Sequence, residues 1–164
     1  MLRNLLLIIS LNFLFLTSFG QTHDQRIRLL VLRKDIVGKM FVFGKWSKTS
    51  GEEIHLTYLG KVTTRSGQIL KILNSSWYWG LAHRATSRIL VFDRSNRFIG
   101  DYYVTMVNDL PTSLENGKLI FHNSSPDCDN KLFSVIDLKK GLPKKIFRLC
   151  KDSSGDTYSF EAAQ

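Results

Sequence analysis

The sequence predicts an all-β protein, built as a single antiparallel β-barrel or sandwich of about ten short strands. Three observations lead to this prediction. Short runs rich in Val, Ile, Phe and Tyr, which fit a pleated and half-buried surface, recur along the chain. Turn-forming residues such as Gly, Asn, Asp and Ser separate these runs. No stretch keeps the apolar spacing and the end signals of a helix over several turns.

The clearest unit spans residues 88–104. Its apolar runs, 89–92 and 98–104, flank a turn segment, 93–97, that contains Asp, Ser and Asn, and this pattern predicts a β-hairpin. Residues 74–84 are expected to be irregular. The other strand candidates are, in chain order, residues 26–32, 39–46, 54–59, 68–73, 119–121, 132–136, 146–150 and 157–160.

A faint internal repeat supports an alternative fold, a series of propeller-blade-like meanders. Asp93 and Asp137 each end an apolar strand and open a turn, and similar short motifs precede both. Their spacing falls in the ~40–50-residue range of propeller blades. A closed propeller normally needs about four or more blades, which is more than this chain can supply alone. A barrel or sandwich is therefore the preferred prediction.

The first twenty residues have the pattern of an export signal. Arg3 supplies a positive start, residues 5–16 are mostly apolar, and the small residues Ser18 and Gly20 precede a cleavage point before Gln21. We therefore expect residues 1–20 to be a cleaved signal peptide. Residues 21–164 are then expected to form a single all-β domain, secreted or periplasmic, with no membrane span after cleavage.

Two cysteines, Cys128 and Cys150, lie in the part of the chain expected to be exported. An even number of cysteines in an oxidising compartment predicts one disulfide bond between them. Closing a loop of this length would stabilise the fold by roughly 3 kcal/mol. Two free thiols are the alternative.

The chain is basic, with 23 Lys and Arg against 14 Asp and Glu. This excess favours anionic partners, such as an acidic glycan or an anionic surface. Near the C-terminus the basic residues form a run that is either an anionic docking face or a protected sheet edge. Its members are Lys139, Lys140, Lys144, Lys145, Arg148 and Lys151.

Motifs for catalysis are missing from the sequence. There is no Gly-x-Ser-x-Gly elbow, no phosphate-binding glycine loop and no zinc-type spacing among the four histidines. The sequence therefore predicts no catalytic residue, no metal site and no cofactor. An unrecognised hydrolase stays a lesser alternative, because several carboxylates lie at strand ends where a pair could form. They are Glu53, Asp93, Asp101, Asp137 and Glu161.

The best candidate for a binding site is the aromatic motif Trp77-Tyr78-Trp79, which is followed by basic residues. If the rings are exposed, they can stack on sugars or anchor a protein partner while the arginines meet an anionic group. If they are buried, they close one end of the core. We expect one tryptophan of each kind, with Trp77 exposed and Trp79 buried. The candidate binding residues are Trp77, Tyr78, Trp79, His83, Arg84 and Arg88.

One short motif has a counterpart in a known family. Gly44-Lys45-Trp46, which precedes a series of strands, resembles the Gly-x-Trp signature of lipocalins. In that family the Trp closes the base of an eight-stranded barrel that carries a small lipophilic ligand. The sequence thus favours an exported, non-enzymatic protein that binds a protein, a glycan or an anionic surface, with a lipocalin-like carrier as the alternative.

Overall fold

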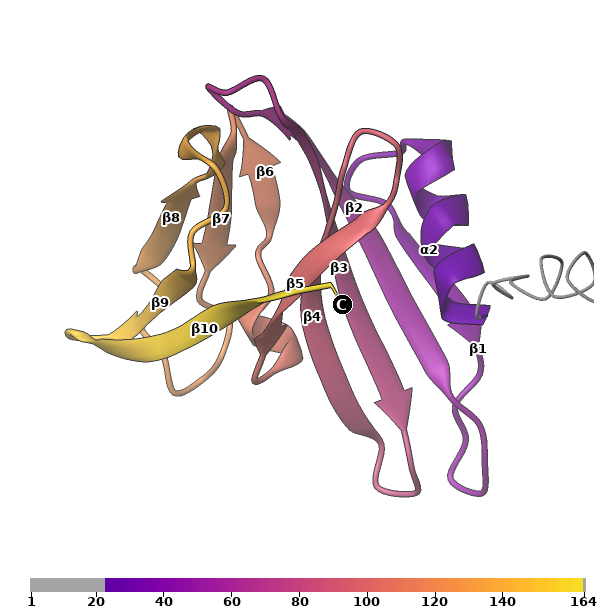
Figure 1. The fold of residues 1–164 in the computed structure, drawn as a ribbon. Coiled ribbons are helices and arrows are strands. Elements are labelled where there is room, and N and C mark those ends of the chain that lie inside the picture. Colours follow the sequence, from indigo (N-terminus) through magenta and orange to yellow (C-terminus); the bar gives the residue numbers. More distant parts are fainter. Residues whose placement is uncertain (1–22, 164) are drawn as a thin grey trace, which may run out of the picture.

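The computed structural model describes residues 23–163 (Figure 1). Seven strands form a large sheet and three form a small one, and all neighbouring strands are antiparallel. The helices and strands are, in chain order, α2 (His23–Lys34), β1 (Met40–Gly44), β2 (Glu53–Thr63), β3 (Ile69–Trp79), β4 (Arg84–Phe92), β5 (Phe98–Val104), the 3-10 helix η1 (Val107–Asp109), β6 (Ser113–Glu115), β7 (Lys118–His122), β8 (Phe133–Asp137), the 3-10 helix η2 (Leu138–Lys140), β9 (Lys145–Lys151) and β10 (Ser154–Ala162).

The predicted all-β antiparallel class is confirmed, and the arrangement is sandwich-like. The large sheet has the order β1-β2-β3-β4-β5-β10-β9 and the small sheet the order β6-β7-β8, so of the two predicted arrangements, barrel and sandwich, the described strands form the second. They do not form four-stranded propeller units, because seven strands make one sheet. Between β5 and β6 the chain leaves the large sheet through a segment that contains Pro111, which has no N–H to donate to a continuing strand.

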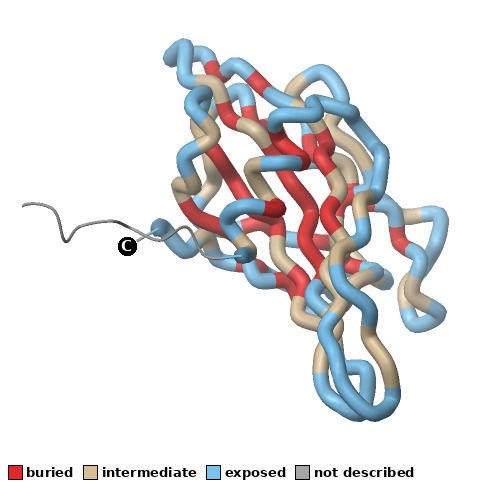
Figure 2. Tube along the Cα trace, turned by 90° about the vertical axis from the view of Figure 1, so that its right-hand side faces the viewer, coloured by how far each residue is buried: buried red, intermediate tan, exposed pale blue. Residues whose placement is uncertain are grey.

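Two apolar cores lie on opposite faces of the large sheet, and strand β4 contributes to both. Successive side chains of a strand point to opposite faces. Ile89 and Val91 accordingly join the core beneath the small sheet. Leu90 and Phe92 join the core beneath α2. This explains the unbroken apolar run of β4, and Figures 1 and 2 show the sheet as a buried middle layer between α2 and the small sheet.

Strand β2 reaches both cores by a bulge. Leu56 and Tyr58 pack under α2, whereas Val62 packs under the small sheet. The pairing with β3 shifts between Tyr58 and Gly60, which inserts one residue into β2. Gly60 adopts a φ of +123°, which favours glycine. The bulge therefore reverses which face the following side chains take.

The expectation of a strand at residues 26–32 is wrong, because this segment lies within α2. Ile27, Val31 and Leu32 are buried, at a spacing that places them on one side of a helix. Asp24 in the first turn and basic residues in the last turn complement the helix dipole. The run is too short and too rich in Ile, Leu and Val for its period to be read reliably, and packing against the sheet decides its conformation.

Both hairpins around β4 are well defined, although only one was expected. Residues 88–104 form the predicted hairpin of β4 and β5, and the Asp93 carboxylate accepts hydrogen bonds from the backbone N–H groups of Ser95 and Arg97 in its turn. Residues 74–84 are not irregular. They form the end of β3, a short turn and the first residue of β4.

The predicted disulfide bond between Cys128 and Cys150 is confirmed, with the two Cα atoms 4.6 Å apart. Cys128 lies in the connection between β7 and β8, and Cys150 lies in β9. The bond therefore ties a long connection of the small sheet to the edge strand of the large sheet. Its stabilisation arises mainly because it constrains the unfolded chain.

The predicted basic run does not form one surface, because Arg148 is only 1% exposed. Its guanidinium Nη1 lies 3.0 Å from an oxygen of Asp109. The Tyr158 hydroxyl donates to the other oxygen of that carboxylate at 3.0 Å. Since a buried charge needs a partner, this pair binds η1 to β9 and β10. The remaining members are exposed, namely Lys139, Lys140, Lys144, Lys145 and Lys151.

Within residues 23–163, no helix has the length and apolar character required to cross a membrane. The predicted signal peptide, residues 1–20, lies outside the described residues.

Candidate functional site: the two faces of the aromatic hairpin

The aromatic motif occupies the last three residues of β3, directly before the turn into β4. Trp77 pairs with Thr86, Tyr78 with Ala85 and Trp79 with Arg84 across the two strands. Because side chains alternate between faces, both tryptophans lie on the α2 side of the sheet and the tyrosine lies on the small-sheet side. The predicted binding residues are therefore split between two faces.

We call the α2-side group the tryptophan shelf. The two indole centroids lie 6.2 Å apart, and Trp77 is 38% exposed while Trp79 is half-buried. The expected exposure of Trp77 is confirmed, but Trp79 is not fully buried. The Trp79 indole N–H donates to the Thr86 hydroxyl at 3.1 Å and fixes its ring. The members of the shelf are Trp77, Trp79, Arg84, Thr86 and Arg88.

The two predicted arginines of the shelf differ in their interaction partners. Arg88 pairs with Asp101 and also lies over the ring of Tyr103. The Arg84 guanidinium lies 5.8 Å from the centroid of the Trp79 ring, a cation–π arrangement. No ion pair of Arg84 is present among the described residues, so its charge is available to a ligand.

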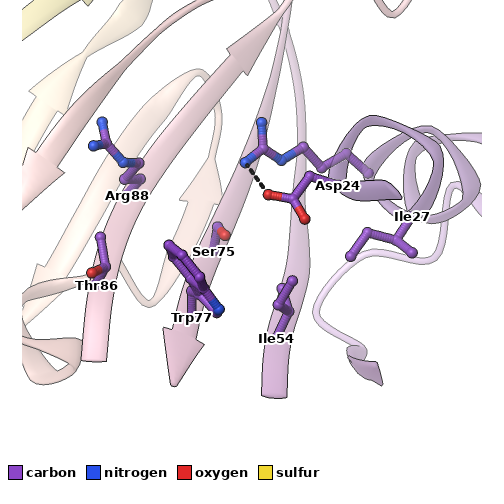
Figure 3. Close-up of a pocket in the computed structure, with 8 residues that line it drawn as sticks. Asp24, Ile27, Ile54, Ser75, Trp77, Thr86 and Arg88 are labelled. Carbon is purple, nitrogen blue, oxygen red and sulfur yellow. Dashed lines mark ion pairs between the residues drawn. The ribbon is translucent and has the colours of Figure 1, made fainter. Parts of the chain in front are cut away.

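Helix α2 forms one wall beside the shelf, as Figure 3 shows. Asp24 and Arg28 of its first turns form an ion pair of 3.7 Å that faces Trp77 and Arg88 across a small hollow. Burial lowers the pKa of the Arg28 guanidinium, while the charge of Asp24 opposes this change. This wall could not be anticipated while residues 26–32 were expected to be a strand.

On the opposite face four rings form a continuous aromatic stack of Trp46, His83, Tyr78 and His55. Successive ring centroids lie 4.0, 4.8 and 4.8 Å apart. The Trp46 indole N–H donates to the Gly80 carbonyl at 2.7 Å, which joins the β1–β2 loop to the β3–β4 turn. These are the two hairpin tips that project at the bottom of Figure 1 and are exposed or half-buried in Figure 2.

A carboxylate supports one end of this stack. The Glu53 carboxylate is hydrogen-bonded to His55 Nε2 and accepts from the backbone N–H of Trp46. The hydrogen bond from His55 holds the pKa of the Glu53 carboxyl below its ordinary value. Burial, and secondly the charge of Glu53, raise the pKa of the Tyr78 hydroxyl. The carboxylate is therefore ionised and the phenol neutral at ordinary pH.

Most of the strand-end carboxylates considered for a hydrolase have a structural partner. Asp93 accepts hydrogen bonds within its turn, Asp101 pairs with Arg88, and Asp137 accepts from the backbone of η2. In the part of the chain that the structure describes, no three His, Cys, Asp or Glu side chains lie close enough to hold a metal ion.

No protein-family model, no curated protein and no solved structure matches this chain. The likeness of Gly44-Lys45-Trp46 to lipocalins can be tested on the structure itself. Trp46 lies in the loop after β1 and binds the neighbouring hairpin, and the large sheet stays open. The barrel implied by that resemblance is therefore not formed by the described residues. Inferences about function rest on the two faces of the hairpin.

Proposed function

We propose that this protein is an exported binding protein whose tryptophan shelf binds an acidic glycan. The observation that carries the proposal is the pair of partly exposed indole rings, 6.2 Å apart, beside the guanidinium of Arg84. Sugar rings have apolar C–H faces that stack on aromatic rings. A carboxylate, sulfate or phosphate on the same sugar can accept hydrogen bonds from an arginine.

The charge of the whole chain supports an anionic ligand. The formal net charge of the whole sequence is +9, which attracts anionic polymers over distances up to about a Debye length. Within the shelf, Arg84 is the arginine whose charge is not neutralised by a carboxylate of the described chain, so it is the first contact expected for an acidic group.

The disulfide bond between Cys128 and Cys150 supports the exported location. Disulfides persist in oxidising compartments and are rare in reducing ones. The signal-like pattern of residues 1–20 agrees with the same location. An acidic glycan outside the cytoplasm would be accessible to such a protein.

A protein partner is the second candidate, because Leu81 at the tip of the hairpin is 74% exposed. A large apolar side chain beside an exposed tryptophan is a common anchor in protein interfaces. The two candidates make different demands on the tip. A glycan depends on the rings and Arg84, whereas a protein partner also depends on Leu81.

Binding to immobilised polysaccharides tests the proposal. The protein should be retained on polygalacturonate and on a sulfated polysaccharide, released by salt, and not retained on neutral dextran. Trp77→Ala should weaken binding by at least about tenfold, equivalent to ~1.4 kcal/mol. Arg84→Gln should weaken binding and reduce its salt dependence.

Two matched controls separate specific binding from simple ion exchange. Arg94→Gln removes an exposed arginine at the other end of β4 and should leave binding unchanged. Leu81→Ser keeps both rings and should also leave glycan binding unchanged. If Arg94→Gln weakens binding as much as Arg84→Gln, or if Trp77→Ala has no effect, net charge alone explains retention and the shelf is not the site.

A further inference from the structure

A second hollow lies on the opposite face of the sheet from the tryptophan shelf. It has a volume of about 250 Å³ and lies between β2, β3 and the segment that runs from η1 to β6. Its lining combines hydrogen-bonding side chains with two rings of the aromatic stack. The lining residues used below are His55, Thr57, Asn74, Ser76, Tyr78 and Thr112.

The alternation of β3 explains why this hollow exists. Leu70 and Ile72 lie on the small-sheet face and are covered by the core. The next side chains on that face are Asn74, Ser76 and Tyr78, which line the hollow. The same strand face thus changes from apolar to polar where the hollow begins.

Strand β4 changes from apolar to polar side chains at the same position along the sheet. Ile89 is paired with Asn74 and belongs to the core, whereas Ser87 is paired with Ser76 and is polar. Two neighbouring strands therefore place buried polar side chains side by side on one face. A purely structural sheet would be expected to continue with apolar residues there.

Two of these buried groups have an atom without a hydrogen-bond partner in the described part of the chain, namely Asn74 Oδ1 and Ser87 Oγ. Asn74 is 9% exposed, and its side-chain NH₂ donates to the Pro111 carbonyl at 2.7 Å. The donor side of the amide is thereby used, and its oxygen is buried without a partner. Buried polar atoms are nearly always paired, so two unpaired ones beside the hollow show that this part of the sheet is not optimised for stability alone.

The outer wall of the hollow is rigidly held. Met106 donates its backbone N–H to the Asp109 carboxylate, which is also bound by buried Arg148 and by Tyr158. These contacts fix η1 and the following residues, including Leu110, against the large sheet. A wall fixed before binding lowers the ordering cost that a ligand has to overcome.

The chemistry of the lining defines the ligand class. No Asp, Glu, Lys or Arg lines the hollow, which argues against an ionic ligand. Its volume of about 250 Å³ lies just below the ~300–1,000 Å³ range of small-molecule pockets, enough for one ring rather than for a lipid or a large cofactor. Asn74, Ser76 and Thr57 offer hydrogen bonds to hydroxyl groups, and Leu110 and Tyr78 offer apolar contact.

We propose that this polar hollow binds a single neutral, hydroxylated ring, a pyranose unit, with its hydroxyl groups hydrogen-bonded to Ser76 and Thr57 and its apolar face against Tyr78. The site is separate from the tryptophan shelf and does not depend on the proposed acidic-glycan binding. It differs from the shelf in depth, in charge and in the face of the sheet that it uses.

Nuclear magnetic resonance titration of the isotope-labelled protein with neutral methyl glycosides of glucose, galactose, mannose and N-acetylglucosamine tests the proposal. At least one glycoside should cause saturable shifts of the Asn74 side-chain amide and of the amides around Thr57 and Thr112. Ser76→Ala should weaken that binding about fivefold, the loss of one hydrogen bond. Ser75→Ala is the matched control on the opposite face and should leave it unchanged.

Two further variants keep the result decisive. If Ser76→Ala does not fold, Thr57→Val is the second test. It removes a hydroxyl group of β2 while keeping nearly the same side-chain shape, and it should weaken binding similarly. Trp77→Ala should bind the neutral glycoside as the unaltered protein does, so failure of the shelf proposal leaves this one standing. No saturable shift with any glycoside, or ordered water alone in the hollow in a high-resolution structure determined with glycoside present, would overturn the proposal.

Discussion

Strands β3 and β4 pair without interruption, yet their two halves lie in different surroundings. In the inner half, residues 89–92 of β4 and Leu70, Ile72 and Leu73 of β3 are buried in the two cores. In the outer half, β3 carries Asn and Ser and then three aromatic residues, and β4 begins with Arg84. The backbone ladder is the same in both halves, so the side chains alone account for the difference.

This difference shows how one pair of strands can serve stability and binding together. Apolar burial in the inner half supplies the main driving force for folding. The outer half can then hold unpaired polar atoms and exposed rings, which cost stability and are typical of functional sites. Three predictions, ordered by the expected change in the free energy of unfolding, test this division.

The largest effect on the free energy of unfolding is expected for a substitution in the inner half. Leu70 is fully buried, so Leu70→Ala should lower the free energy of unfolding by about 2–5 kcal/mol, from lost burial and the cavity left behind. Leu81→Ala, the same substitution at the exposed hairpin tip, should change it by less than about 0.5 kcal/mol. Equilibrium denaturant unfolding measures both. Equal losses would show that the outer half carries as much stability as the inner half.

An intermediate effect on the free energy of unfolding is expected when Trp77 or Trp79 is replaced. Neither ring is fully buried, so each Trp→Ala change should cost less than the roughly 3–5 kcal/mol of a buried aromatic residue. Both indole N–H groups donate a hydrogen bond, to Glu52 and to Thr86, so Trp79→Ala should cost more than Trp77→Ala because the Trp79 ring is less exposed. Denaturant melts of the two variants test the order. Losses of about 3 kcal/mol or more in both would identify the rings as core and exclude the shelf as a binding surface.

The sequence predicts the parts of the molecule that depend on local chemistry. Turn residues mark the hairpin around Asp93, and two cysteines in a chain with an export pattern indicate the disulfide. Alternation would also have assigned Arg148 correctly, because Ile146 and Arg148 are buried while Lys145 and Phe147 are exposed. Reading the basic residues as a run concealed that alternation.

The parts that depend on distant contacts could not be predicted in the same way. Residues 26–32 become helical because a sheet formed later in the chain offers an apolar face. Asn and Ser in β3 made residues 74–84 look irregular, which hid the separation of Trp77 from Tyr78. The stack of Trp46 on His83 joins two hairpin tips, and its partners are far apart in sequence.

The smallest effect on the free energy of unfolding is expected for a substitution of Glu53, whose carboxylate supports the aromatic stack of the outer half. The hydrogen bond from His55 holds the pKa of Glu53 below its ordinary value of 4.5. The fold therefore favours the ionised form, and the stability gained is present above that ordinary value and lost as the pH falls through the lower pKa of the folded state. Glu53→Gln should remove this part of the pH dependence.

Denaturant midpoints measured across acidic pH check this expectation for Glu53. The unaltered protein should be more stable than Glu53→Gln near neutral pH, and the two curves should converge once the pH has fallen below the lowered pKa of the Glu53 carboxyl. Because the substituted amide keeps the shape of the side chain, convergence would assign the difference to charge and hydrogen bonding with His55. Parallel curves would contradict it, and the outer half would then depend on the Trp46–Gly80 hydrogen bond rather than on Glu53 to keep its two hairpin tips together.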